Sequence, residues 1–142
     1  MLKIITILLL LVCIFTSCKK DNENGCPAYG QEVIISNELY QHAPDDHLQI
    51  MEAEIIDNCL HITFASSGCN GDSWEFKLLD QGAIMKSNPP QRNLRLSLKN
   101  EELCDAWFTR EILFDISTLQ VDGRRVLLNI TNSGDQLLYE YR

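Results

Sequence analysis

Beyond residue 30, the chain alternates apolar and polar positions with a period of two, which is typical of β-strands and not of helices. Turn signals such as Asn70-Gly71, Pro89-Pro90 and Asp122-Gly123 separate the alternating runs. The runs are QEVIIS (31–36), LQIMEAEII (48–56), CLHITFAS (59–66), SWEFKLLD (73–80), NLRLSLKN (93–100), WFTREILFDI (107–116), RRVLLNIT (124–131) and QLLYEYR (136–142). The pattern predicts an all-β fold, an antiparallel β-sandwich of about seven or eight strands, with a small β-barrel as the alternative.

The pair of runs around Asp57-Asn58 predicts a hairpin, because these two residues form a good two-residue turn. Closing the turn aligns three apolar pairs on one face and two polar pairs on the other. The apolar pairs are Ile55 with Leu60, Ala53 with Ile62 and Met51 with Phe64, and the polar pairs are Glu54 with His61 and Glu52 with Thr63.

The apolar segment 4–15 follows a lone Lys3 and is shorter than the ~20 residues that a membrane-spanning helix needs. Its length fits the hydrophobic region of a signal peptide, which we place at residues 1–17 and exclude from the fold. A secreted protein cut nearby and a signal anchor are the alternatives. The polar stretch KKDNENG (19–25) has no periodicity and predicts a flexible tether, so a single β-domain is expected over residues 26–142.

The end of the apolar segment, Phe15-Thr16-Ser17-Cys18, resembles the bacterial lipobox, with Phe15 where Leu is usual. The resemblance implies cleavage before Cys18 and a diacylglycerol on the Cys18 sulfur. Two acyl chains give stable membrane anchoring. We therefore expect residues 18–25 to comprise the lipidated cysteine and the tether, and the membrane to be a partner through the lipid.

The acidic balance of the chain excludes one class of partner. The net charge is −8 at pH 7, and removing residues 1–17, whose only charged residue is Lys3, takes it to −9. An acidic chain repels phosphate backbones, so nucleic acid is not an expected partner.

Four cysteines remain in the expected domain: Cys26, Cys59, Cys69 and Cys104. An even number in an exported chain predicts two disulfides, with three possible connectivities. We favour Cys69 with Cys104, which both lie in loops just before strands, and Cys26 with Cys59, which would fasten the start of the domain to the hairpin. A four-cysteine zinc site would be expected to contain a C-x₂-C pair, and none is present.

Candidate catalytic and metal-binding residues are sparse. His42, Asp45, Asp46 and His47 could in principle hold a divalent ion, but their spacing matches no defined metal motif. Cys69 has no histidine after it to act as its base, and the sequence from Asp21 fails the EF-hand pattern. We therefore expect no catalytic residues, no metal and no cofactor.

The paired acids Asp45-Asp46 and Glu101-Glu102 are more typical of solvated loops than of a glycosidase pair across a cleft. Aromatic side chains offer one candidate for binding. Trp74 and Tyr139 share the phase of the apolar positions in their strands, which predicts core positions. Trp107 is out of phase with Phe108, which predicts that it lies exposed on the opposite face as a contact residue.

The N-terminus, with Lys19 directly after Cys18, resembles lipoproteins of the Bacteroidota. The segments GCNGDSWEF, PPQRNLRLSL and LCDAW resemble small uncharacterised lipoproteins of that group. The resemblance implies anchoring in the outer membrane of the cell envelope, with surface exposure as a further expectation. The leading hypothesis is a non-enzymatic binding module for an outer-membrane protein or an extracellular ligand. An inhibitor of a secreted enzyme such as a protease, and a hydrolase with an unrecognised site around His42 and His47, are the alternatives.

The anchoring hypothesis predicts the behaviour of a Cys18→Ser variant of the full chain. Without the acceptor sulfur, the protein should leave the membrane fraction and stop incorporating labelled fatty acid, because no acyl chain remains to hold it. Fractionation and labelling of cells expressing each form measure this. A variant that stays in the membrane fraction as fully as the wild type would show that lipid on Cys18 is not the anchor.

Overall fold

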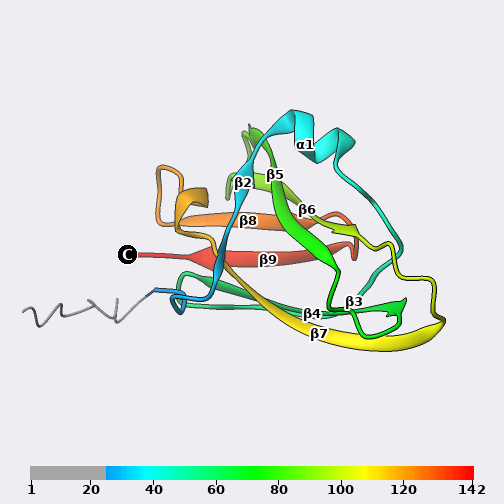
Figure 1. The fold of residues 1–142 in the computed structure, drawn as a ribbon. Helices are drawn as coiled ribbons and strands as arrows, with labels where there is room; N and C mark the ends of the chain where they lie inside the picture. The colour runs from blue at the N-terminus through cyan, green and yellow to red at the C-terminus, as the bar shows by residue number, and fades with distance from the viewer. Residues whose placement is uncertain (1–24) are drawn as a thin grey trace, which may run out of the picture.

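The computed structural model describes residues 25–142, which form nine β-strands, one short α-helix and one 3-10 turn (Figure 1). A four-stranded sheet has the order β1-β7-β4-β3, with β1 at Gln31–Glu32, β7 at Ala106–Asp115, β4 at Cys59–Gly68 and β3 at Gln49–Ile56. A five-stranded sheet has the order β2-β5-β6-β8-β9, with β2 at Ile34–Ile35, β5 at Glu75–Met85, β6 at Gln91–Lys99, β8 at Arg125–Ile130 and β9 at Asp135–Glu140. The helix α1 is Asn37–His42, and the 3-10 turn is Ser117–Leu119.

The predicted signal peptide (1–17), the predicted lipidation site Cys18 and residues 19–24 of the predicted tether lie outside the described residues. Within residues 25–142, no helix has the length and apolar character needed to cross a membrane.

The two sheets stack with their inner faces together, so the predicted β-sandwich is confirmed. Leucines of β6 meet the apolar side chains of β4 in the core between the sheets, and all of these side chains are fully buried. The core also contains Trp74 and Tyr139, as their phase predicted. Burial of each apolar side chain contributes about 1.5–3 kcal/mol, so this interface is the main stabilising element of the fold.

The sheets are mixed, whereas the sequence analysis predicted antiparallel pairing. Three pairs are parallel: β1 with β7, β2 with β5, and β6 with β8. The segment 31–36, predicted as one strand, accounts for two of them, because it is split at Val33. Val33 is buried in the core, and the residues on either side of it join different sheets. This short segment therefore ties the two sheets together.

The β3–β4 hairpin has the predicted register from Glu52 to Ile56. Ile55 faces Leu60 and Glu54 faces His61. Beyond Glu52 the register shifts at a bulge, so that Ile50 faces Phe64 and Met51 is 58% exposed. The predicted pairing of Met51 with Phe64 is therefore wrong: the bulge inserts one residue, which sends Met51 to solvent and places Ile50 against the core.

The outer face of the five-stranded sheet is covered by α1 and the segment that follows it. Arg95 of β6 points outward and donates to the carbonyl oxygens of Tyr40 (Nε, 2.9 Å) and Ala43 (Nη2, 3.1 Å). A cation at the carbonyl end of a helix is favoured by its dipole. Ser97, two residues further along β6, donates to the Pro44 carbonyl at 2.6 Å. These contacts hold the chain on one outer face as it passes from β2 to β3.

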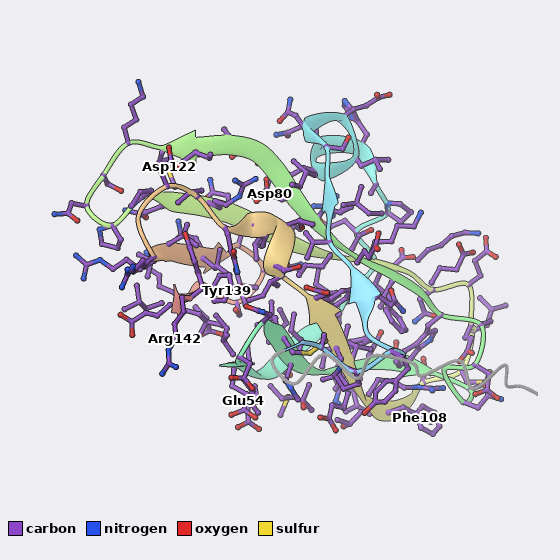
Figure 2. All side chains as sticks on the ribbon, turned by 90° about the vertical axis from the view of Figure 1, so that its left-hand side faces the viewer. Glu54, Asp80, Phe108, Asp122, Tyr139 and Arg142 are labelled. Carbon is purple, nitrogen blue, oxygen red and sulfur yellow. A yellow bond between two sulfur atoms is a disulfide. The ribbon has the colours of Figure 1, made fainter. Side chains whose placement is uncertain are left out.

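A buried ion pair fixes β5 to β6 where their register shifts. Asp80 is fully buried, and its carboxylate accepts two hydrogen bonds from Arg92, at 2.8 Å from Nε and 3.0 Å from Nη2. The same carboxylate accepts from the backbone N–H of Gly82 at 2.6 Å, and Gly82 has φ +81°, which favours glycine. Figure 2 shows Asp80 inside the sandwich, in contrast with Glu54 on the outside of the other sheet.

An Asp80→Asn variant tests the importance of this pair. It leaves the Arg92 guanidinium buried without a counter-charge, so we expect a loss of about 3–5 kcal/mol in the free energy of unfolding. Urea denaturation followed by tryptophan fluorescence measures the loss. Lys99→Ala, which breaks the exposed pairs with Glu75 and Glu101, is the control and should be far milder. Equal losses in the two variants would contradict a special role for the buried pair.

Candidate functional site

The outer face of the four-stranded sheet is acidic. Because β4 directs Leu60, Ile62 and Phe64 into the core, the residues between them point outward. The register places His61 beside Glu54 in one row, and Thr63 between Glu52 and Glu111 in the next. His61 Nδ1 lies 3.6 Å from Glu111 Oε1. Two rows of this face thus carry three carboxylates, of which Glu54 and Glu111 lie beside the His61 imidazole.

Basic residues are concentrated in the other sheet. Of the six Lys and Arg residues within strands, five lie in the five-stranded sheet, and only Arg110 lies in the four-stranded sheet. Arg110 is on the inner side of β7, where its guanidinium donates to Asp72 Oδ1 at 3.0 Å and to the Asn70 carbonyl at 3.2 Å. Among the strand residues that the structure describes, no lysine or arginine therefore offsets the carboxylates on the outer face. The surface field there favours a positively charged partner.

Trp107 lies at one end of this acidic face. It pairs with Ser67 of β4, and half of its surface (50%) is exposed, which agrees with its predicted phase. The His47 ring lies 6.0 Å from it, centroid to centroid, at a tilt of 43°. A large aromatic side chain held by a neighbour and open to solvent is a common anchor in protein interfaces. Its role in binding stays a prediction.

The two disulfides lie at opposite ends of β4. Cys26 joins Cys59 at the first residue of the strand, and Cys69 joins Cys104 just beyond its last residue, the pairing favoured from the sequence. Trp107 lies close to the second disulfide, because it faces Ser67. The first disulfide fixes the point where the described chain enters the sandwich. Figure 1 shows this entry and the C-terminus at the same end, opposite the β6–β7 connection.

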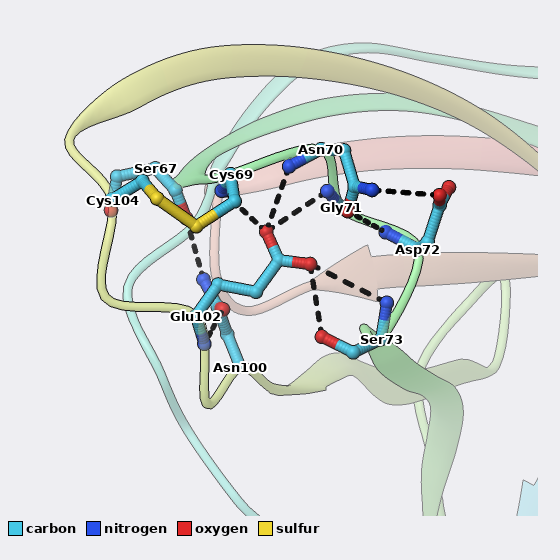
Figure 3. The surroundings of a disulfide bond; sticks show 9 residues. All are labelled: Ser67, Cys69, Asn70, Gly71, Asp72, Ser73, Asn100, Glu102 and Cys104. Atoms are coloured by element: carbon cyan, nitrogen blue, oxygen red, sulfur yellow. Dashed lines mark hydrogen bonds between the residues drawn. A yellow bond between two sulfur atoms is a disulfide. The ribbon is translucent and has the colours of Figure 1, made fainter.

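The loop at 69–73 wraps around the carboxylate of Glu102 (Figure 3). One oxygen accepts from the backbone N–H groups of Cys69 (2.6 Å), Asn70 (3.1 Å) and Gly71 (2.9 Å), and the other accepts from the Ser73 hydroxyl at 2.9 Å. These donors, with the Gly71 N–H first among them, lower the pKa of the Glu102 carboxyl from 4.5 to about 2, against an opposing effect of burial. The arrangement is an anion-binding loop filled by a side chain of the same protein.

The other acid and histidine candidates do not come together. His42 ends α1, Asp45 pairs with Arg95 at 3.3 Å, and Asp46 accepts from the backbone N–H of Asn100 at 2.7 Å. His47 instead lies beside Trp107. Nowhere in residues 25–142 do three or more histidine, cysteine or acidic side chains gather as a metal site. The side chains of segment 42–47 therefore fasten the connection from β2 to β3, which links the two sheets, to the rest of the domain.

One feature was not predicted from the sequence, a polar groove of about 630 Å³ at the end where the described chain begins. Its lining comes from three separate stretches of the chain: Ile55, Asp57, Asn58, Gln120, Leu138, Glu140, Tyr141 and Arg142. Beneath it, the Tyr139 hydroxyl donates to Asn58 Oδ1 and accepts from Gln120 Nε2 at 2.8 Å. Burial raises the pKa of this tyrosine. No local motif could have revealed residues that only the fold brings together.

No protein-family model matches this chain, and no curated protein is significantly similar to it in sequence. Solved structures of other proteins share its fold, among them the three that follow. A NigD-like immunity protein from Bacteroides caccae matches with a TM-score of 0.59 at 7% identity, over 77% of this chain and 58% of that one. A protein of unknown function (DUF1344) from Bacteroides vulgatus matches with a TM-score of 0.53 at 15% identity, over 79% of this chain and 56% of that one.

A third structure, a protein from Parabacteroides distasonis described as toxin-related, matches with a TM-score of 0.53 at 15% identity, over 80% of this chain and 61% of that one. This chain therefore spans less than two thirds of the length of each of the three structures. None of the three is described as an enzyme. At these identities the likeness shows a shared fold, found in proteins of Bacteroides and Parabacteroides.

The lowered pKa of Glu102 predicts how a Glu102→Gln variant responds to acid. A carboxyl with a lowered pKa in the folded state stabilises the fold above its unfolded pKa of about 4.5 and loses this contribution as the pH falls through about 2. The variant should therefore be less stable than the wild type at neutral pH, and the difference should shrink between pH 4.5 and 2. Thermal melting at several pH values measures this.

The matched control is Glu101→Gln, which removes the neighbouring exposed carboxylate paired with Lys99. Its difference from the wild type should not follow the same course with pH. If the Glu102→Gln difference stayed constant down to pH 2, the loop contacts would not be responsible for the lowered pKa.

Proposed function

We propose that this protein is a non-enzymatic, lipid-anchored interaction module of the cell envelope, which presents the Trp107 end of its acidic face to a protein partner. The observation that carries the proposal is the placement of Trp107 relative to the chain entry. Cys59 and Ser67 are eight residues apart on β4, which corresponds to about 26 Å. A lipid on Cys18 and the tether before Cys26 would leave the Trp107 end directed away from the membrane.

The non-enzymatic role is supported by the use of the reactive side chains. The four domain cysteines are in disulfides, Glu102 is enclosed by its loop, and Asp80 is paired with Arg92. The buried Tyr139 hydroxyl is hydrogen-bonded within the sandwich. The fold leaves Trp107 exposed at the end of the acidic face, and aromatic side chains are enriched in protein interfaces. The description of one structural neighbour as an immunity protein is compatible with an interaction role.

The proposed partner is basic where it meets this face. Glu52, Glu54 and Glu111 stand in two adjacent rows of the sheet with no lysine or arginine between them. Complementary charge would speed association and select among partners, while Trp107 would provide the desolvated anchor. The proposed partner is an outer-membrane protein or an extracellular ligand. A secreted enzyme that this protein inhibits is the alternative partner, and it would bind the same surface.

A Trp107→Ala variant tests the proposal. Cross-linked partners are recovered from native outer membranes with the full-length protein, and the affinity of the recovered partner is measured in solution. Loss of an interface anchor costs about 2 kcal/mol or more, so we expect a roughly 30-fold weaker complex.

Ile56→Ala is the matched control, since Ile56 is also half exposed (48%) on the same sheet but lies at the opposite end, opposite Cys59. It should leave the affinity unchanged. If Ile56→Ala weakened the complex and Trp107→Ala did not, the binding surface would lie at the membrane-proximal end. Turnover of a recovered partner by the wild-type protein would contradict the non-enzymatic role.

A further inference from the structure

Strand β7 has one fully paired side and one largely open side. Every residue from Ala106 to Asp115 is paired with β4. On the other side β1 pairs only with Phe114 and Asp115, so residues 106–113 have no strand beside them in the part of the chain that the structure describes. The chain turns away before β1, because the Gly30 N–H donates to the Pro27 carbonyl at 2.7 Å and Cys26 is held at Cys59.

The direction of the backbone groups along this edge follows from the register. In an antiparallel pair, only alternate residues exchange hydrogen bonds with the neighbouring strand. The Ile116 N–H donates to the Asn58 carbonyl at 2.9 Å, which places the even-numbered residues of β7 in the hydrogen-bonded pairs with β4. Trp107, Thr109 and Glu111 therefore direct their N–H and C=O groups toward the open edge. All three residues are exposed.

This edge lacks three of the features by which proteins prevent strand addition, and its one inward-pointing charge, Arg110, is paired with Asp72. Proteins protect sheet edges with prolines, lysines or bulges. The opposite edge strand of the same sheet, β3, has a bulge at Met51. In β7, the pairing with β4 runs without a register shift, and the strand contains neither proline nor lysine. A regular, exposed edge of this kind can accept an extended peptide as an additional strand.

We propose that the edge of β7 from Trp107 to Glu111 binds an extended basic segment of the partner protein as an added strand. The inference rests on the proposed function and specifies how the partner binds. The charge of the site selects the occupant: Glu111 lies on this strand, Asp105 directly precedes it, and the guanidinium of Arg110 is already engaged by Asp72. A second copy of this acidic chain would be repelled at the same edge.

The two faces of β7 specify the sequence of the added strand. Two of its inward positions would lie beside Phe108 and Ile112, which pack against the core, and these positions suit apolar side chains. The inward position between them would lie beside Arg110, whose guanidinium is held by Asp72. Its outward positions would lie beside Thr109 and Glu111 and suit lysine or arginine. The bound segment is therefore an alternation of apolar and basic residues, with an outward position at Trp107 where a basic side chain can lie over the indole ring.

Amide hydrogen exchange on the full chain provides the direct test, with a synthetic ten-residue peptide of alternating Val and Lys as the probe. In the free protein, the N–H groups of Trp107, Thr109 and Glu111 should exchange rapidly, while those of Phe108 and Arg110 are protected by β4. The probe should slow exchange at the three edge positions by about tenfold or more. A peptide of alternating Val and Glu should not. Edge amides that are already protected in the free protein, or equal protection by both peptides, would overturn the proposal.

A matched pair of variants separates backbone pairing from side-chain contact. Thr109→Pro removes an N–H that β4 does not use, and edge strands tolerate proline at such positions. It should weaken binding of the Val–Lys peptide by about tenfold, because the hydrogen bond from the residue 109 N–H is lost and the edge hydrogen bond next to it is weakened. Thr109→Ala, which keeps this N–H, should bind the peptide nearly as the wild type does. Equal binding by the two variants, or dimerisation through β7, would overturn the proposal. If Thr109→Pro fails to fold, the exchange measurement on the wild type decides alone.

The same variants distinguish this inference from the proposed function. Loss of the native partner by Trp107→Ala, with the partner retained by Thr109→Pro, would leave the interaction role standing and remove strand addition. Loss of the partner by Thr109→Pro but not by Thr109→Ala would support both. Retention by Trp107→Ala and Thr109→Pro alike would overturn both.

Discussion

The structure depends on the burial of alternate side chains of β4 between the two sheets. Leu60, Ile62 and Phe64 are fully buried, and the period of two then forces the intervening residues to the outer face. Because β4 is flanked by β3 and β7, its register also decides which residues of those strands face outward. The acidic rows, the exposure of Trp107 and the direction of the β7 backbone groups all follow from this one constraint.

Polar contacts then fix what the core alone leaves free. Arg95 holds the end of α1 against the five-stranded sheet, and Glu102 holds the loop beside the Cys69–Cys104 disulfide. Each links segments that are distant in the sequence, and each satisfies several backbone groups with one charged side chain, which makes these hydrogen bonds stronger than neutral ones. The loop next to Trp107 is thereby held in one conformation, so the proposed binding end is organised before a partner arrives, which reduces the entropic cost of binding.

The sandwich is asymmetric, and this asymmetry is what points to its role. Helix α1 and the chain after it cover the outer face of the five-stranded sheet, where most of the strand cations lie, while the outer face of the other sheet is open and acidic. Among residues 25–142, its β7 edge also has no neighbouring strand over most of its length. A fold that needed only stability would gain from covering an exposed strand edge, since such edges promote aggregation. An uncovered edge beside an exposed tryptophan is better explained as a place for another chain.

The local pattern of apolar and polar residues was enough to predict the fold class, most of the strands, the hairpin register from Glu52 to Ile56 and the core positions of Trp74 and Tyr139, because the period of two is a local property that burial enforces. It also indicated the exposure of Trp107 through its phase. The three-dimensional structure was needed to see the parallel pairs, the bulge that exposes Met51, the enclosure of Glu102 and the open edge of β7. These features depend on which distant segments become neighbours, and a local pattern of apolar and polar residues contains no information about strand order.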